Sequence, residues 1–164
     1  MMQVKLKDGS VIEAAEGSNL MDLAGGISGR LKKEAIVARV NGRMMDLSQP
    51  VHDGDQVEIF TLKDPEGLET YRHSSAHIMA EAVGELFPGT KFGIGPVIKE
   101  GFYYDFDTDH VFTPEDLQKI EEKIAEIVSR NTPFVRKVLK REEALEYFGN
   151  LGEKYKVELI TDLP

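Results

Sequence analysis

The sequence contains no cysteine. This absence excludes disulfide bonds, thiolate zinc sites and cysteine nucleophiles, and it is compatible with a cytosolic protein. Long apolar runs are also missing, since no stretch approaches the roughly 20 residues that a membrane-spanning helix needs. The first residues, MMQVKLKDGS, lack the apolar core of a secretory signal. We therefore expect a cytoplasmic protein that contacts no membrane.

Basic residues are fewer than acidic residues. Twenty Lys and Arg residues against 29 Asp and Glu residues give a net charge of −9. Such a surface repels nucleic acid at long range, so we expect no DNA partner, and an RNA contact only where basic residues cluster or a partner domain supplies them. The length of 164 residues suits one ordinary domain or two small ones, and 41% hydrophobic content indicates a folded globular chain.

Residues 1–62 are predicted to form one compact unit. Two short strands surround the Asp8-Gly9 turn, which is a strong hairpin signal. Ser18 can then cap a helix, with a Gly-Gly pair ending it, and two further strands follow at EAIVARVNG and QVEIFT. The order strand, strand, helix, strand, turn, strand predicts a β-grasp, ubiquitin-like fold.

A linker and a second unit follow. Pro65 and Gly67 lie among charges without hydrophobic periodicity, so residues 63–69 are predicted to be a linker. The second unit, residues 70–164, opens with a helix over about residues 70–87, which a Pro-Gly pair stops.

The rest of the second unit mixes helices and strands. KFGIGPVIKEGFYYDFDTD suits strands joined by tight turns, and Thr113 caps a helix whose buried stripe is predicted to comprise Leu117, Ile120, Ile124 and Ile127. PFVRKVLK is predicted to be a strand, REEALEYFG a short helix that Gly149 ends, and KYKVELIT a final strand. These elements predict an α+β domain in which helices pack on an antiparallel sheet.

Two histidines, His73 and His77, are the clearest candidates for chemistry. They lie four residues apart, so both imidazoles leave the same face of a helix. Ala80 and Gly84 flank them and are expected to leave open space above the rings for a ligand. The alternative is a half-exposed polar edge with no ligand. The core face of this helix is predicted to comprise Met79, Ala82, Val83 and Leu86.

A metal site receives less support from the sequence. A metalloprotease motif needs glutamate directly after the first histidine, and Ser74 occupies that place. A zinc site needs three or four protein ligands. The other two histidines, His52 and His110, are predicted to be solvent-exposed residues of a turn and a loop. His73 and His77 could bind a metal only with ligands from elsewhere.

The segment GIGPVIKEGFYYDF is the second feature. Its glycines allow the backbone to approach a ligand, but the dinucleotide fingerprint is missing because no third glycine has the required spacing and no helix follows. By alternation, Tyr104 and Phe106 share one face of a strand, where they could stack on a base or form core. Lys156 lies in the predicted final strand, and most strand lysines on such a mixed face are solvent-exposed.

Three motifs in order, HSSAHIMAEAV, GIGPVIKEGFYYDF and EKYKVELI, closely resemble the N-terminal region of bacterial threonyl-tRNA synthetase. The resemblance covers essentially the whole chain: residues 1–62 resemble the TGS domain, and residues from about 63 onward resemble the start of the editing domain. It implies a ligase that joins threonine to tRNA(Thr) with ATP, in catalytic and anticodon-binding domains that this chain lacks. It also implies an editing domain that hydrolyses mischarged seryl-tRNA(Thr).

The same resemblance implies partners and cofactors. The tRNA(Thr) acceptor end would be the partner, and a homodimer would form through domains absent here. ATP, magnesium and zinc would bind in those absent domains, with no cofactor in this chain.

The resemblance also implies roles for individual residues. By motif position, His73 and His77 would border the terminal ribose and position the attacking water, and Lys156 would orient that water or hold the aminoacyl ester. Attack on the ester carbonyl develops an oxyanion, which donors near these residues would have to stabilise.

Substrate binding would involve the aromatic segment. Tyr104 and the Gly95-Pro96 backbone would help hold the 3′-terminal adenosine. The family pairs its HxxxH with a CxxxH further along the chain, and this second half is absent from the sequence. The expectation is a truncated editing domain that is inactive or weak by itself.

Two other functional hypotheses remain open at this point. TGS units also occur in regulatory and GTPase proteins, so residues 1–62 alone would fit a regulatory or RNA-binding module without catalysis. A small autonomous metalloprotein is the other alternative, and metal analysis of the purified chain would test it.

Overall fold

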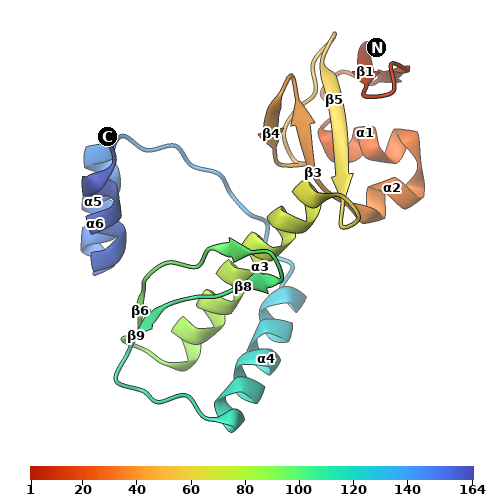
Figure 1. The fold of residues 1–164 in the computed structure, drawn as a ribbon. Coiled ribbons are helices and arrows are strands. Elements are labelled where there is room, and N and C mark those ends of the chain that lie inside the picture. The colour runs from red at the N-terminus through yellow and green to blue at the C-terminus, as the bar shows by residue number, and fades with distance from the viewer. The chain divides into compact units, whose positions relative to one another are not determined.

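A computed structural model describes all residues, 1–164, and they divide into two compact units, Met1–Arg72 and His73–Pro164 (Figure 1). One helix, α3, contributes its first two turns to the first unit and the rest to the second. We describe each unit by itself.

The first unit contains a five-stranded mixed sheet with strand order β2-β1-β5-β3-β4. The outer strands pair antiparallel with their neighbours, whereas the central pair β1 and β5 is parallel. Two helices, α1 and α2, follow the first hairpin, and this is the predicted β-grasp order. The elements are β1 (Met2–Leu6), β2 (Val11–Ala14), α1 (Leu20–Ile27), α2 (Gly29–Glu34), β3 (Ala35–Val40), β4 (Arg43–Met45) and β5 (Gln56–Thr61).

Local turn chemistry explains why the first unit folds as the sequence predicts. Asn41 and Gly42 both have positive φ, 49° and 84°, as a tight two-residue hairpin turn between β3 and β4 requires. The predicted helix cap at Ser18 is wrong by one residue. Asn19 is the N-cap: its side-chain oxygen accepts a hydrogen bond from the Asp22 amide, and the Asp22 carboxylate accepts one from the Asn19 amide.

The core of the first unit lies between α1 and one face of the sheet. Leu20 and Leu23 of α1 are buried against Val4 and Val57, which belong to the central strands β1 and β5. The Gly-Gly pair does not end α1, since the helix continues to Ile27. Burial of these apolar side chains is the main stabilising contribution to this unit.

The segment predicted to be a linker is mostly helical. Helix α3 spans Pro65–Leu86, so only the first two residues of the predicted range 63–69 lie outside it. Proline suits the first turn of a helix because its missing N–H has no partner there. Asp64 also accepts hydrogen bonds from the Thr61 amide and hydroxyl, which fixes the entry to the helix. The division into domains at residues 1–62 and 70–164 stays a prediction.

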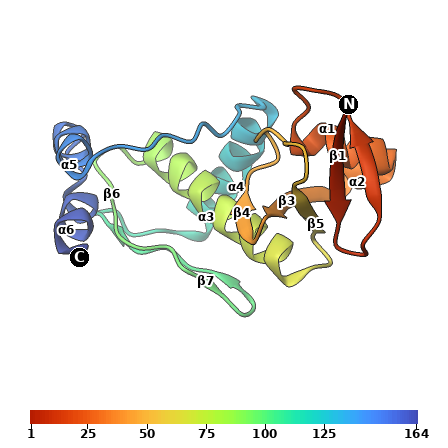
Figure 2. The same cartoon turned by 90° about the horizontal axis from the view of Figure 1, so that it is seen from above.

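The second unit is built on α3, a second long helix and short antiparallel ladders (Figure 2). Strand β6 pairs with β9, and β7 pairs with β8, so the aromatic segment forms the predicted strands and turns. The elements after α3 are β6 (Lys91–Phe92), β7 (Val97–Ile98), β8 (Gly101–Phe102), β9 (Phe106–Asp107), α4 (Pro114–Ser129), α5 (Arg141–Asn150) and α6 (Lys154–Asp162).

Helix α4 begins as predicted, with Thr113 as its cap. Thr113 and Asp116 exchange side-chain-to-backbone bonds across the first turn. Ile120 and Ile127 are buried with Ala82 and Val83 of α3, but Leu117 is 62% exposed. The predicted stripe is therefore one turn too long, because no element of the unit covers the start of α4 on that side.

Two predicted strands of the second unit are wrong. Residues 133–140 have no regular structure and every one of them is exposed, since no other segment pairs with them. Residues 154–161 lie in helix α6. In α6 the partly buried positions Lys156, Val157 and Ile160 follow helical spacing, and the apolar alternation that suggested a strand is also compatible with a helix packed on α5 and β6.

A charged network joins α3 to the end of α4. The Arg130 guanidinium donates to both Glu85 oxygens, at 2.7 and 2.9 Å, and to Glu126 at 2.7 Å. The hydrogen bonds from Arg130 lower the pKa of Glu85 from 4.5 to about 2. The carboxylate is thus held in its charged form by the fold.

This pKa shift gives a pH dependence with a definite sign. A carboxyl whose pKa is lower in the folded chain stabilises it above pH 4.5, and this contribution is lost as the pH falls toward 2. We expect the urea midpoint of the second unit to be lower at pH 3 than at pH 5. In the Arg130→Gln variant this decrease of the midpoint should be smaller. Urea titrations of both proteins at several pH values measure it. An equal fall in both would contradict the assignment to Glu85.

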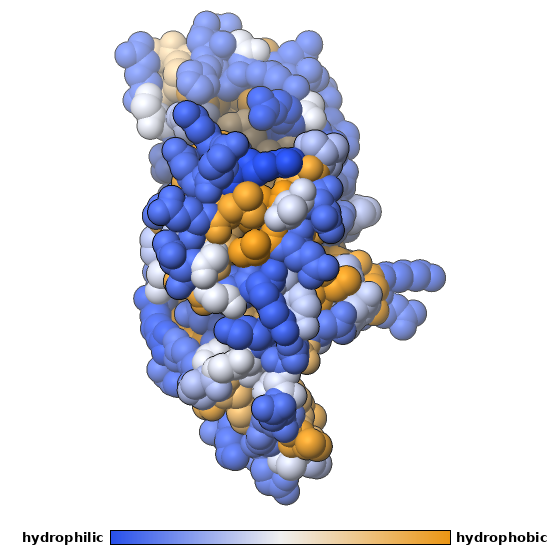
Figure 3. All heavy atoms as spheres, turned by 90° about the vertical axis from the view of Figure 1, so that its left-hand side faces the viewer, coloured by the Kyte–Doolittle hydropathy of each residue, from blue (hydrophilic) through white to orange (hydrophobic).

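Apolar side chains remain exposed around α5 and α6. They include Phe134, Val135, Val138, Leu151, Leu159 and Leu163. Figure 3 looks from the side on which α5 and α6 lie in Figure 1 and shows hydrophobic groups at the surface among hydrophilic ones. No helix of the structure is both long and apolar enough to cross a membrane.

Candidate functional site

The two predicted histidines of α3 are in direct contact. The Nε2 atoms of His73 and His77 lie 3.0 Å apart, and their ring centroids are 4.8 Å apart. One ring donates an N–H and the other accepts it, so at least one imidazole nitrogen is free of a proton. Helical spacing alone creates this contact, as the sequence predicts.

His77 has a lowered pKa although its side chain reaches solvent. Desolvation is the largest cause, followed by the positive charges of His73, when it is protonated, and of Lys156. All three effects disfavour the imidazolium form. The fold thus favours the neutral form of His77, and a neutral imidazole can accept a proton from water.

Lys156 reaches this histidine pair from α6, far away in sequence. Its Nζ lies 3.1 Å from a carboxylate oxygen of Glu153 and 5.5 Å from the centroid of the Phe92 ring. The side chain is 35% exposed. The prediction that Lys156 is a strand residue is wrong, but the helix gives it partners that a solvent-exposed strand lysine would lack.

The space predicted above the histidines is partly filled. A Cβ on Gly84 would lie 3.1 Å from the Phe92 ring, so this glycine admits the aromatic side chain and does not leave a gap. Ala80 is buried. The expectation of open space beside both small residues is therefore wrong, and the ring of Phe92 forms a wall between α3 and the segment that follows it.

Tyr104 forms the other side of the same aromatic wall. Its ring stacks on Phe106, with centroids 5.2 Å apart and planes at 3°, and meets the Phe92 ring edge-on at 6.2 Å. The prediction that Tyr104 and Phe106 share a face is confirmed. Burial and the negative charge of Glu153 raise the pKa of Tyr104, so its hydroxyl stays protonated and can donate a hydrogen bond.

Gly95 lies directly against Tyr104. A Cβ at Gly95 would come within 2.4 Å of the tyrosine Cδ2, so only glycine lets the ring lie flat on this backbone. The neighbouring Pro96 carbonyl accepts a hydrogen bond from the Tyr103 amide at 3.4 Å. The Gly95-Pro96 backbone and Tyr104, which the sequence assigned to one function, are thus adjacent in the fold.

The structure brings together residues from three sequence segments. His77 and Lys156 interact electrostatically, Lys156 lies over Phe92, Phe92 contacts Tyr104, and Tyr104 covers Gly95. Sequence reasoning missed Phe92, and it also missed Glu153. The Glu153–Lys156 spacing of three residues would have indicated an ion pair only if residues 154–162 had been recognised as a helix.

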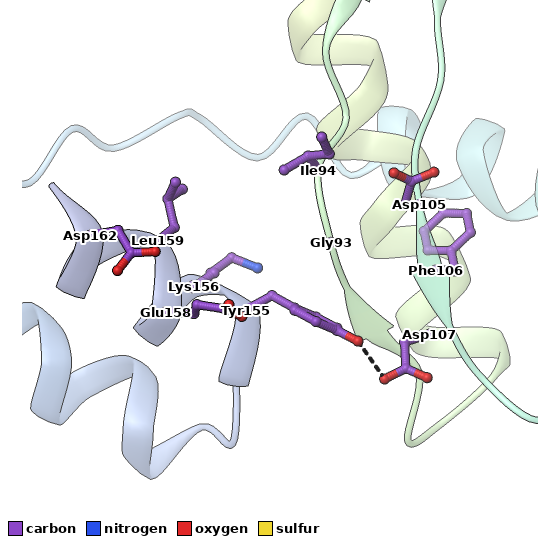
Figure 4. A pocket seen from close by; sticks show the side chains of 10 residues that line it. All are labelled: Gly93, Ile94, Asp105, Phe106, Asp107, Tyr155, Lys156, Glu158, Leu159 and Asp162. Atoms are coloured by element: carbon purple, nitrogen blue, oxygen red, sulfur yellow. Dashed lines mark hydrogen bonds between the residues drawn. The ribbon is translucent and has the colours of Figure 1, made fainter.

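A cavity of about 500 Å³ lies between α6 and the β6–β9 ladder (Figure 4). Lys156 and four carboxylates, those of Asp105, Asp107, Glu158 and Asp162, are among its lining residues, but neither histidine is. The Tyr155 hydroxyl donates to Asp107 at 2.9 Å across the cavity's edge, which ties α6 to β9. Lys156 therefore lines the cavity and also interacts electrostatically with His77.

The remaining histidines have other partners. His110 stacks on Phe87, with centroids 4.5 Å apart, and its Nε2 lies 2.8 Å from Asp116, so it is a partly exposed packing residue beside a second hollow. His52 is exposed beside Asp55. Across residues 1–164, no three His, Asp or Glu side chains are grouped closely enough to hold a metal ion.

Comparison with known proteins agrees with the fold of the first unit. The TGS domain family matches residues 2–61. Among solved structures, the chain aligns with the crystal structure of ATBAG1 in complex with HSP70 at 11% identity and a TM-score of 0.35, covering 99% of this chain and 93% of that one. This similarity is too low to indicate a common fold.

Curated relatives match the whole chain. The threonine–tRNA ligase of Desulforamulus reducens is 48% identical over 164 residues, which is 100% of this chain and 26% of the relative. The threonine–tRNA ligases of Pelobacter propionicus and Maricaulis maris are 51% and 49% identical, over 99% and 100% of this chain and 26% of each relative. The chain thus spans about a quarter of the length of these proteins. It contains a TGS domain and, over its whole length, corresponds to the N-terminal region of threonine–tRNA ligases.

Proposed function

We propose that this chain works within a ligase that attaches threonine to tRNA(Thr) using ATP, and that its second unit is part of a proofreading site that hydrolyses seryl-tRNA(Thr). One observation supports the proofreading site. The fold brings the His73–His77 pair, the Lys156 ammonium and the Tyr104–Gly95 surface together from three distant segments. Such convergence is typical of a site and unusual for unrelated surface residues.

The chemistry of these groups suits ester hydrolysis. A neutral imidazole of His73 or His77 can accept a proton from the attacking water, and the Lys156 ammonium can stabilise the oxyanion that develops on the ester carbonyl. The Tyr104 ring lies on the backbone of Gly95, and its protonated hydroxyl is a hydrogen-bond donor; we place the 3′-terminal adenosine beside this surface. Binding of a metal ion by His73 and His77, with further ligands from elsewhere, stays a prediction.

The need for such a site follows from the substrates. Serine lacks only the methyl group of threonine, and a difference of this size supplies about 1–3 kcal/mol of selectivity in a binding pocket. A second, hydrolytic site that accepts the smaller product compensates for this weak discrimination. The partner of the second unit is then the aminoacylated acceptor end of tRNA(Thr).

The wider assignments are part of the same proposal. We place the ligase in the cytoplasm, where aminoacylated tRNA is consumed. ATP, magnesium, zinc and the contacts of a homodimer are assigned to regions outside residues 1–164. The alternative, a TGS regulatory or RNA-binding module without catalysis, would account for residues 2–61 but not for the similarity that extends over the whole chain.

A chimera tests the proposal. Residues 1–164 would replace the corresponding region of the Desulforamulus reducens ligase, and deacylation of seryl-tRNA(Thr) and threonylation would both be measured. We expect the chimera to deacylate seryl-tRNA(Thr), and the His73→Ala variant to do so about tenfold more slowly, because His77 still remains to accept the proton.

The matched control is His52→Ala, which removes an exposed histidine of the first unit and should change neither rate. A chimera that charges threonine but never hydrolyses seryl-tRNA(Thr) would overturn the proofreading assignment. So would a His73→Ala variant that loses threonylation and keeps deacylation.

A further inference from the structure

Glu153 occupies the N-cap position of α6 but does not cap the helix. Its side chain accepts no hydrogen bond from a backbone amide of the first turn. Instead its Oε2 lies 3.1 Å from Nζ of Lys156, three residues later. The carboxylate is only 22% exposed, so the bond is partly shielded from water.

The local sequence fixes this arrangement. Gly152 has a φ of 68°, a conformation that favours glycine, and it turns the chain from α5 into α6. Glu153 then begins the helix, and helical spacing places Lys156 on the same face one turn later. A carboxylate at this point also interacts electrostatically with Tyr104, whose ring meets the Phe92 ring edge-on.

Lysine needs such a partner to act at a defined place. Its side chain has four rotatable bonds and loses considerable conformational freedom when held in one position. Two groups restrict Lys156 here: the Phe92 ring, with its centroid 5.5 Å from Nζ, and the Glu153 carboxylate. The ring provides a surface for the ammonium group, and only the carboxylate is a directional acceptor.

We propose that Glu153 is a positioning residue of the proofreading site, whose carboxylate holds the Lys156 ammonium over the Phe92 ring, where it interacts with the histidine pair. This inference rests on the proposed function, because Lys156 must act there. Glu153 itself contacts no reacting atom. Its effect on hydrolysis passes through Lys156, because the Tyr104 hydroxyl is protonated at neutral pH with or without the Glu153 charge. The stability of α6 does not depend on the Glu153 carboxylate as a cap.

A double-mutant cycle in the ligase chimera tests this role. Glu153→Gln preserves the shape of the side chain and removes its charge. We expect kcat for seryl-tRNA(Thr) hydrolysis to fall about fivefold, since the pair is charge-assisted but partly exposed, with KM little changed. In a Lys156→Ala background, the same Glu153→Gln change should have no further effect on the rate.

Glu158→Gln is the matched control. Glu158 belongs to the same helix and lines the cavity beside Lys156, but it forms no ion pair. Its rate should equal that of the unaltered chimera. The urea midpoints of all variants should agree closely if Glu153 only positions Lys156. If Glu153 had a structural role, Glu153→Gln would lower both the urea midpoint and the hydrolysis rate, with or without Lys156.

The outcomes separate this inference from the proposed function. If Glu153→Gln lowers the rate by the same factor with and without Lys156, or leaves it unchanged, Glu153 is not the positioning residue. If the unaltered chimera does not hydrolyse seryl-tRNA(Thr), the proposed function fails first. A fivefold loss that disappears in the Lys156→Ala background supports the inference.

Discussion

A Lys156→Ala variant of the ligase chimera is expected to lose about 100-fold in the rate of seryl-tRNA(Thr) hydrolysis, with threonylation unchanged. Removal of one preformed donor to a developing oxyanion has an effect of this size in other hydrolytic sites. Lys156 interacts electrostatically with the histidine pair and contributes to the lowered pKa of His77. Single-turnover deacylation of seryl-tRNA(Thr) measures the loss directly.

Lys154→Ala is the control for this experiment. Lys154 lies two residues away in α6, but its Nζ contacts Asp107 at 2.6 Å and lies over the Tyr155 ring, away from the histidines. We expect near-normal hydrolysis from this variant. Equal losses from the two lysine variants would mean that the rate reports the docking of α6 and not a role for Lys156.

The largest expected effect on stability follows from Gly67. This buried glycine of α3 lies against the end of β5, and a Cβ there would be 2.0 Å from the Thr61 carbonyl oxygen and 2.7 Å from its carbon. Both are backbone atoms, so the clash can be relieved only by moving the helix or the strand. Gly67→Ala should lower the free energy of unfolding of the first unit by about 3 kcal/mol, measured by urea titration with far-UV circular dichroism.

Gly26→Ala is also a glycine-to-alanine change in a helix, but it is expected to raise the stability of the first unit. Gly26 also lies in a helix, α1, but a Cβ there would meet no atom within 4 Å. Alanine should therefore raise stability by about 0.5–1 kcal/mol through its better helix propensity. A Gly67→Ala variant as stable as the unaltered chain would show that α3 can separate from Thr61 without cost.

The features that the sequence predicted correctly depend on neighbouring residues. The Asn41-Gly42 hairpin, the Thr113 cap and the contact between His73 and His77 are set within a few residues, by backbone conformation or helical spacing. The geometry of such interactions is set by neighbouring residues, so it can be predicted without knowledge of distant contacts. The family resemblance was equally accessible, because its motifs are short and their order along the chain is fixed.

The features that it missed depend on distant partners. Residues 133–140 have the composition of a strand, but a strand exists only where a second segment pairs with it, and residues 1–164 supply none. For residues 154–162, the apolar pattern was compatible with both a strand and a helix. The segment is a helix because it packs against α5 and β6. That error also concealed the Glu153–Lys156 pair, which exists only at helical spacing.

By itself, the sequence determined the β-grasp unit, the histidine pair and the family to which the motifs point. Only the tertiary structure decided that Phe92 fills the space over Gly84, that Tyr104 lies on Gly95, and that Lys156 reaches the histidines. The physical reason is that a local pattern fixes which direction a side chain leaves its own element. The distance between elements is fixed by the packing of buried side chains, and no single segment contains that information.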